Sequence, residues 1–235
     1  MIDELSQHYR VIVPDMLGFG SSDSPQGYDI YSEENHATRL LGLMDTLKIK
    51  HWTHVMHDAG GLWTWELFKK QPHRISKLII LNTIIYKEGF DPPIRFKPGI
   101  IAKIAMWSYR NGISSNTMLK GLFASGLTKN NLSKIDLEGY KKPLLEGKTR
   151  AMYYFFSRTC NTLKDYSKVV SKIESPVAVI WGENDSFLQW KPQSDKVIKD
   201  LKISAEHIHL LDAKHFIQEE QPQEINRYIL NFLKD

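Results

Sequence analysis

Short apolar runs and amphipathic stretches alternate along most of the chain, as expected when strands and helices follow one another. Five runs predict strands, at residues 10–13, 52–56, 77–81, 176–181 and 206–211. Helices are expected over residues 32–47, 60–70 and 222–233. In the first of these, the apolar positions fall on one helical face: Ala37, Leu40, Leu41, Met44 and Leu47. The predicted order is therefore strand, turn and helix, repeated.

Strands that are apolar on both faces and alternate with helices predict an α/β fold with a mostly parallel sheet flanked by helices. Between residues 90 and 171 this rhythm changes, because the segment is rich in Tyr, Phe, Met and Trp and shows no convincing strand. An all-helical insertion at the carboxyl edge of such a sheet lies where ligands bind. The sequence thus predicts a core in two parts, residues 1–89 and 172–235, and a helical cap over residues 90–171.

The composition excludes several classes of protein but does not indicate a particular function. The 235 residues are 42% hydrophobic and 25% charged, which suits one globular core. The 31 basic residues form no stripe interleaved with aromatics, so nucleic acid is not expected as a partner. Cys160 is the only cysteine and cannot form an internal disulfide. The start lacks a signal-peptide pattern and no apolar run reaches the ~20 residues of a membrane span, so a cytoplasmic enzyme with no membrane partner is expected.

The strongest local motif is the segment His57-Asp58-Ala59-Gly60-Gly61, which lies between a predicted strand and a predicted helix. This context fits a nucleophile elbow, a tight turn whose central side chain projects from the top of the sheet. Small flanking residues make room for such a turn, and the amide of Ala59 would face the same point as the start of the helix. Asp58 would be the nucleophile, although a helix N-cap aspartate is an equally common use of this residue.

Two later residues favour the catalytic interpretation of Asp58. Asp185 follows the strand over 176–181, and His215 follows the strand over 206–211. The chain order nucleophile, acid, histidine is that of α/β-hydrolases. His207 and His209 lie two apart on one strand, but no third ligand accompanies them, so neither a metal nor a cofactor is predicted.

The motifs together resemble the epoxide hydrolase and haloalkane dehalogenase branch of the α/β-hydrolase superfamily. The segments that carry the resemblance are residues 57–61, Gly182-x-x-Asp185, residues 215–222 and the early loop at 14–23. The resemblance implies substitution at carbon: Asp58 attacks a carbon bearing an epoxide oxygen or a halide and forms an ester. His215 then activates the water that hydrolyses this ester, and Asp185 orients His215. The expected partners are a small organic substrate and water.

The residues around the predicted nucleophile favour an epoxide over a halide. Haloalkane dehalogenases carry Trp after the nucleophile, and fluoroacetate dehalogenases carry Arg, whereas this chain has Ala59. Epoxide hydrolases use cap tyrosines as acids on the epoxide oxygen. Candidates for stabilising the oxyanion or leaving group are Ala59, Tyr109, Tyr153 and Tyr154, although each tyrosine could equally pack the cap. Candidates for the substrate pocket are Trp107, Phe155 and Phe216.

The beginning of the chain departs from the family pattern. The family has three further strands there and a His-Gly loop that supplies the second oxyanion amide. One of those strands would lie between the strands expected at 10–13 and 52–56. Either the sequence starts at an internal methionine or those two strands pair directly, and we favour an incomplete chain. The exposed edge would favour a homodimer formed by strand pairing.

Four alternatives to an active epoxide hydrolase therefore stay open. They are a haloalkane dehalogenase, a different hydrolase in which Asp58 is not the nucleophile, an ester-bond transferase that differs only in what accepts the acyl group, and a truncated or non-catalytic descendant.

Overall fold

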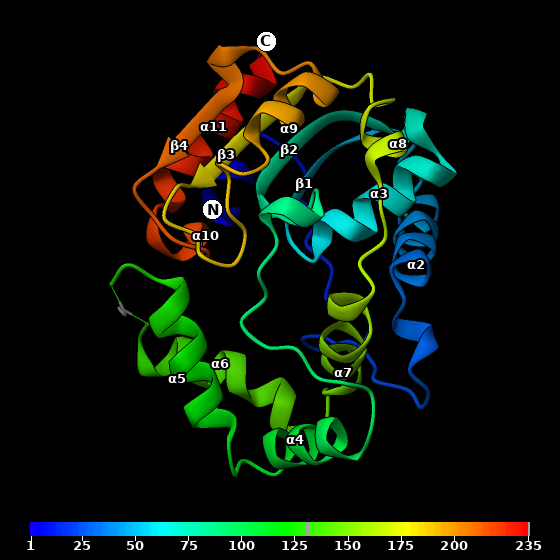
Figure 1. Cartoon of the computed structure of the whole chain (residues 1–235). Coiled ribbons are helices and arrows are strands. Elements are labelled where there is room, and N and C mark those ends of the chain that lie inside the picture. Colours follow the sequence, from blue (N-terminus) through cyan, green and yellow to red (C-terminus); the bar gives the residue numbers. More distant parts are fainter. Residues whose placement is uncertain (130–131, 235) are drawn as a thin grey trace.

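The computed structural model describes residues 1–129 and 132–234, which are built around a parallel sheet (Figure 1). Its strands lie in sequence order: β1 (Trp52–Asp58), β2 (Ile75–Thr83), β3 (Val177–Gly182) and β4 (Ile208–Leu211). Each neighbouring pair is parallel, so the carboxyl ends of all four strands meet at one edge. Side chains that follow these ends are thereby brought together.

The two central strands are buried on both faces because helices cover both. Leu78 and Ile80 of β2 point to one face, and Ile79 and Leu81 point to the other. The first face is covered by α2 (Glu33–Thr46), α3 (Gly60–Lys70), α8 (Ser167–Val170) and α9 (Ser194–Leu201). The second is covered by α1 (Ile2–Leu5), α10 (Ile217–Glu220) and α11 (Pro222–Lys234). The continuous apolar runs of the sequence follow from this double cover.

Local chemistry explains where the helices next to the site begin and end. The side chain of Ser32 accepts a hydrogen bond from the amide of Asn35 and caps α2 at its start. Helix α3 ends at Lys70, two residues before Pro72, as the sequence predicts. Short 3₁₀ turns complete the connections: η1 (Asp29–Tyr31), η2 (Pro72–Arg74), η3 (Lys87–Gly89), η4 (Thr159–Asn161) and η5 (Ala205–His207).

The strand expected at residues 10–13 is wrong. Those residues have no regular structure, and Val13 is 65% exposed. A strand needs a partner for its backbone groups, and in the described chain β1 pairs only with β2. The outer edge of β1 is therefore open in the residues that the structure describes. Dimerisation through this edge stays a prediction, which light scattering would test.

The segment between β2 and β3 is helical, as expected for a cap. It contains α4 (Ile100–Arg110), α5 (Ser115–Gly126), α6 (Lys134–Leu145) and α7 (Arg150–Ser157) before α8. In Figure 1 these helices lie at the end of the molecule opposite the C terminus, beyond the carboxyl ends of the strands. The division into domains at residues 89 and 171 stays a prediction. Among the described helices, none combines the length and apolar character needed to cross a bilayer.

Candidate active site

Asp58 lies on a sharp turn that ends β1 and leads into α3. Its φ of +50° places it in the left-handed region, which is unfavourable for a residue with a side chain. The hydroxyl of Thr83, at the end of β2, donates to the carbonyl of Asp58 over 2.6 Å and accepts from the amide of Gly61 over 2.9 Å. The amide of Ile84 also donates to the Asp58 carbonyl, over 3.2 Å. Hydrogen bonds from β2 therefore hold the strained turn in place.

The second glycine of the motif is required by close packing. A Cβ at Gly61 would lie 2.4 Å from the Thr83 hydroxyl and 2.6 Å from the carbonyl oxygen of Ile84. A Cβ at Gly60 would meet nothing nearer than the Met56 side chain, at 3.7 Å. The close approach of α3 to the end of β2 thus explains one glycine of the pair and leaves the other free to vary.

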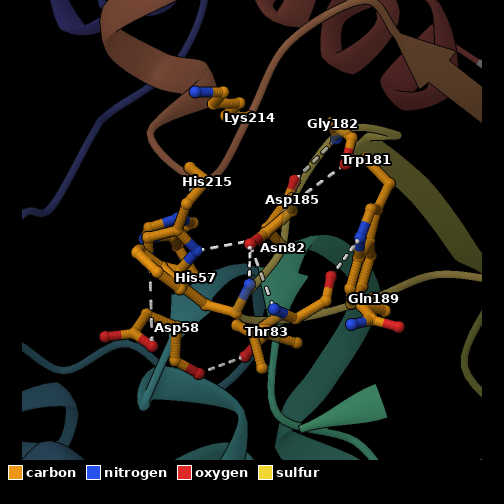
Figure 2. A network of polar contacts seen from close by, with 12 residues as sticks. His57, Asp58, Asn82, Thr83, Trp181, Gly182, Asp185, Gln189, Lys214 and His215 are labelled. Atoms are coloured by element: carbon orange, nitrogen blue, oxygen red, sulfur yellow. Dashed lines mark hydrogen bonds and ion pairs between the residues drawn. The ribbon is translucent and has the colours of Figure 1, made fainter. Parts of the chain in front are cut away.

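His215 lies between two carboxylates that come from different strand ends (Figure 2). Its Nδ1 donates to Oδ2 of Asp185 over 2.9 Å, and its Nε2 lies 3.8 Å from Oδ1 of Asp58. The second distance is longer than a direct hydrogen bond. The side chain of Asp58 is 45% exposed, whereas the side chains of His215 and Asp185 are buried. The three residues predicted from motif order therefore come together, with the free side of His215 facing Asp58.

The buried carboxylate of Asp185 is held by several donors. The amides of Phe187 and Leu188 donate to its Oδ1 over 2.7 and 3.0 Å. The side-chain amide of Asn82, next to Thr83 at the end of β2, donates to its Oδ2 over 2.8 Å. Asn82 also accepts from the amide of Gly182 over 2.8 Å, so it ties β2 to the end of β3. Burial raises the pKa of Asp185, but the hydrogen bond and charge of His215, together with the hydrogen bonds from Asn82 and Leu188, outweigh this, and the net pKa is lowered.

The charge state of His215 depends on both carboxylates. Burial lowers its pKa, while the hydrogen bond to Asp185 and the negative charge of Asp58 raise it. The raising effects are larger, so the pKa of His215 lies above its usual 6.5. Loss of the negative charge on Asp58 would remove one of these raising effects and so lower the pKa of His215.

His57 supports His215 from the side. Burial lowers the pKa of His57 to about 4, so its ring is neutral at pH 7. Its Nε2 lies 2.9 Å from the carbonyl oxygen of His215, and because that oxygen can only accept, Nε2 carries the proton. The two rings also pack with their centroids 4.8 Å apart. His57 therefore fixes the backbone that carries His215.

Asp58 opens onto a cavity of about 640 Å³ between the sheet and the cap. Most of its wall is apolar, with Trp63 and Leu122 among the lining residues. Polar groups converge on it as well: Tyr109, Tyr154, His36 and Glu33. This volume and this mixture are typical of a small-molecule site.

The comparison with protein families matches residues 1–222 to the family described as alpha/beta hydrolase fold. The chain belongs to the alpha/beta hydrolase family. It is 26% identical over 252 residues to epoxide hydrolase 4 of Homo sapiens, covering 99% of the chain and 67% of that protein. It is 27% identical over 255 residues to cis-3-alkyl-4-alkyloxetan-2-one decarboxylase of Shewanella oneidensis, covering 100% of the chain and 77% of that protein. The solved epoxide hydrolase VrEH1 of Vigna radiata has the same fold, with a TM-score of 0.73, 19% identity and coverage of 99% and 85% of the two chains.

Within this alpha/beta hydrolase, the predicted cap residues fall into two groups. Tyr109, Tyr154 and Phe155 line the cavity together with Asp58 and Ala59. Burial raises the pKa of both tyrosine hydroxyls, so both stay protonated at neutral pH. No other group of the described residues hydrogen-bonds to either hydroxyl, which leaves both free to donate to a ligand. Their roles in leaving-group stabilisation stay predictions.

Three of the predicted residues do not line the cavity. Tyr153 is buried in the cap and packs against Tyr28, with ring centroids 4.3 Å apart. Phe216 packs against His215 and against Phe123, behind the histidine. Trp107 is 58% exposed and points out of the cap, on the face of α4 opposite Tyr109. The pocket assignments of Trp107 and Phe216 are therefore wrong.

Sequence reasoning missed several residues that shape the site. Asn82 and Thr83 are polar residues that directly follow the apolar run Leu78–Leu81, and that position was the available signal. His36 and Glu33 reach the cavity from α2, where only their burial distinguishes them from other polar helix residues. His207 and His209 instead pack on Phe232 and Tyr228, and Cys160 is buried.

Proposed function

We propose that this alpha/beta hydrolase opens a small epoxide by attack of Asp58 on carbon and then hydrolyses the resulting ester. The observation that carries the proposal is a carboxylate at a strained elbow, open to an apolar cavity, with the buried His215–Asp185 pair 3.8 Å behind it. An ionised carboxylate can attack carbon without a base. The first step therefore needs no direct hydrogen bond between Asp58 and Nε2 of His215. The resemblance to epoxide hydrolases at about a quarter identity supports the same chemistry.

In the first step an oxygen of Asp58 bonds to an epoxide carbon and the bond from that carbon to the ring oxygen breaks. The released oxygen takes a proton from Tyr109 or Tyr154, the two cap hydroxyls that line the cavity with Asp58. Because burial raises the pKa of both hydroxyls, each holds its proton until charge develops on the substrate oxygen. The amide of Ala59, at the start of α3, adds positive potential beside Asp58.

In the second step His215 removes a proton from water, and the resulting hydroxide attacks the ester carbonyl of Asp58. Ester formation neutralises Asp58 and so removes one of the charges that raise the pKa of His215. The histidine is therefore more readily neutral, and able to act as a base, once the ester exists. Asp185 keeps Nδ1 protonated and stabilises the imidazolium that forms. The bond from the ester carbonyl carbon to the alkyl oxygen then breaks, and that oxygen takes the proton of the new Asp58 carboxyl group, which releases the diol and restores the carboxylate. The proton on His215 passes to the tyrosinate left by the first step.

A haloalkane dehalogenase is the second candidate, because an Asp ester serves both reactions. Ala59 offers no side-chain donor for a halide, whereas the two cavity tyrosines offer donors for an oxygen. The non-catalytic alternative differs in predicting no ester with any substrate.

Trapping the ester would decide among these candidates. The variant His215→Ala should retain attack by Asp58 and lose hydrolysis, and it would be incubated with an aryl epoxide and, separately, with a bromoalkane. We expect an intact-mass increase equal to the whole epoxide, because ring opening expels nothing, and no adduct in Asp58→Asn/His215→Ala. An increase equal to the bromoalkane less HBr would support the dehalogenase. A folded variant that forms no adduct with either compound would contradict both.

A further inference from the structure

The outermost cap helix, α4, has apolar residues on the face that points away from the protein. Ile100, Ile104 and Trp107 follow each other at helical spacing, and Ile101 lies beside them. These four side chains are between 57% and 74% exposed. We call them the α4 stripe. A soluble helix normally turns such a face inward, and a contiguous exposed apolar patch marks an interaction site.

The opposite face of α4 packs against the rest of the cap. Ala102, Met106 and Tyr109 are buried in the cap, and Tyr109 reaches the cavity. The stripe is therefore not a core face left uncovered by a shift of the helix. Figure 1 shows α4 at the tip of the cap, at the end farthest from the C terminus, where an extended flat surface could reach it.

Charge around the stripe is strongly one-sided. Residues 90–171 contain fourteen of the 31 basic residues and five of the 27 acidic residues. Next to the stripe, Lys97, Lys103 and Arg110 are exposed and form no ion pair with any described residue. The rest of the chain carries more acidic than basic residues, so the basic excess lies in the segment that contains the cap helices.

The acidic residues of the cap helices do not neutralise this end. Glu138 pairs with Lys141 at 3.4 Å, and Glu146 pairs with Lys148 at 3.5 Å. Asp136 is occupied in the N-cap of α6, where it accepts from the backbone and hydroxyl of Ser133. The cations flanking the stripe are thus available to an anionic partner.

We propose that the α4 stripe docks this protein on an anionic membrane surface. Apolar side chains with a tryptophan, flanked by Lys and Arg, have the composition of a helix that lies in the interface, with the indole at headgroup level and the cations on lipid phosphates. A second copy of the chain is a poorer occupant, because a two-fold contact would place the same basic rim against itself. Surface docking needs no membrane-spanning segment, so it is compatible with a chain whose described helices include none.

If α4 docks through its stripe, the membrane lies against its outer face, while Tyr109 on its inner face points toward the cavity. The helix then separates the bilayer surface from the cavity by its own thickness. An apolar substrate dissolved in the membrane would thus be concentrated next to the cap. Docking at the membrane does not depend on the reaction at Asp58.

Vesicle co-sedimentation tests the proposal. The full chain is mixed at low salt with vesicles of phosphatidylcholine and phosphatidylglycerol, or of phosphatidylcholine alone. We expect binding to the anionic vesicles that weakens with added salt. The double variant Ile104→Ser/Trp107→Ser should bind at least about tenfold more weakly, because it removes two inserted side chains. Ile2→Ser is the matched control, since Ile2 is an exposed isoleucine on α1, which packs on α11, and it should bind like the unmodified chain.

Tryptophan fluorescence gives an independent readout. All six tryptophans lie in the described residues, and Trp107 is the one with an exposed indole. Brominated lipids should quench it in the unmodified chain, and Trp107→Phe should lose this quenching while still binding.

Two outcomes would overturn membrane docking. One is equal binding, or none, by the folded chain and the double variant. The other is self-association detected by light scattering that the double variant abolishes, without vesicle binding, which would identify a second copy as the occupant.

Discussion

At the scale of single residues, the position of His215 between two carboxylates makes the second reaction step depend on pH. The pKa of His215 is raised above 6.5, mainly by Asp185 and Asp58 against the effect of burial. A base must be neutral, and Asp58 carries no charge in the ester, so ester hydrolysis should fall as pH drops through the pKa that burial and Asp185 then set for His215. Removing the charge in Asp185→Asn should move this limb to lower pH and slow hydrolysis at its plateau. Single-turnover rates with an aryl epoxide over a pH series measure both effects, and an unmoved limb would exclude Asp185 as the charge that sets it.

The glycine pair after Asp58 offers a matched test of the elbow packing. Gly61→Ala would place a methyl group 2.6 Å from the backbone oxygen of Ile84, so α3 or β2 must move. We expect a loss of about 1–3 kcal/mol in the free energy of unfolding. Gly60→Ala meets only the Met56 side chain at 3.7 Å and should be neutral or slightly stabilising. Urea unfolding of the two variants compares them directly, and equal stabilities would contradict the packing argument.

The same residues show what the sequence could predict about the site. Asp58, Asp185 and His215 were found because each follows a strand in a fixed chain order, and the structure brings them together. Asn82 was missed as a support because its partner, Asp185, is over a hundred residues away in sequence. The contact of His57 with the carbonyl of His215 could not be predicted for the same reason. Trp107 was misplaced because aromatic composition does not say which face of α4 is outward.

At the scale of elements, His54 links β1 to α3 in a way that requires a neutral ring. The indole of Trp52 donates to its Nδ1 over 3.1 Å, so Nε2 carries the proton and donates to Thr64 over 2.9 Å. Burial lowers the pKa of His54 to about 4. Protonation would remove the acceptor for Trp52 and leave a charge between strand and helix.

Acid should therefore weaken this contact. The folded pKa of His54 is below the unfolded value of 6.5, so the unfolded chain binds more protons between these values. The stabilisation is present above pH 6.5 and is lost as pH falls towards 4, by up to about 3 kcal/mol for one histidine. In His54→Gln, which keeps a donor and an acceptor, the stability of the protein should fall less over this range. Urea midpoints at a series of pH values would show it, and parallel curves for both proteins would rule out His54 as a source.

Most elements were predictable because the apolar pattern is unambiguous where both faces of the sheet are covered. The strands at β1, β2 and β3 and the helices α2, α3 and α11 lie where the pattern indicates. The run at residues 10–13 has the same composition but no pairing partner, and strand formation depends on that partner more than on the run itself. Helix α9 was missed because its apolar face is narrow, with only Val197 and Leu201 buried.

At the scale of the whole molecule, the cap is joined to the core through a buried polar cluster where the chain returns from α7 to α8. Tyr166 donates to Oε1 of the buried Glu66 over 2.7 Å, and Lys69 donates to Oε2 over 2.8 Å. Lys164 lies 3.5 Å from the same carboxylate and 3.7 Å from Glu33 of α2. Burial raises the pKa of Glu66, but these donors outweigh it and the net pKa is lowered, so the cluster holds a charged carboxylate. No local pattern of the sequence predicts this cluster, since its members come from three separate segments.

Tyr166→Phe tests how firmly this cluster ties the two parts together. The change removes a hydrogen bond to a charged group and leaves one oxygen of Glu66 with only the longer contact to Lys164. We expect the free energy of unfolding to fall by about 1–3 kcal/mol, since a buried charged acceptor loses a donor.

Tyr9→Phe is the control, because Tyr9 is exposed and should tolerate the change. If urea unfolding followed by fluorescence and by circular dichroism stays coincident in Tyr166→Phe, cap and core unfold as one unit. If the two probes separate, this hydroxyl is what couples them. Unchanged stability would mean that Lys69 and Lys164 alone hold the carboxylate.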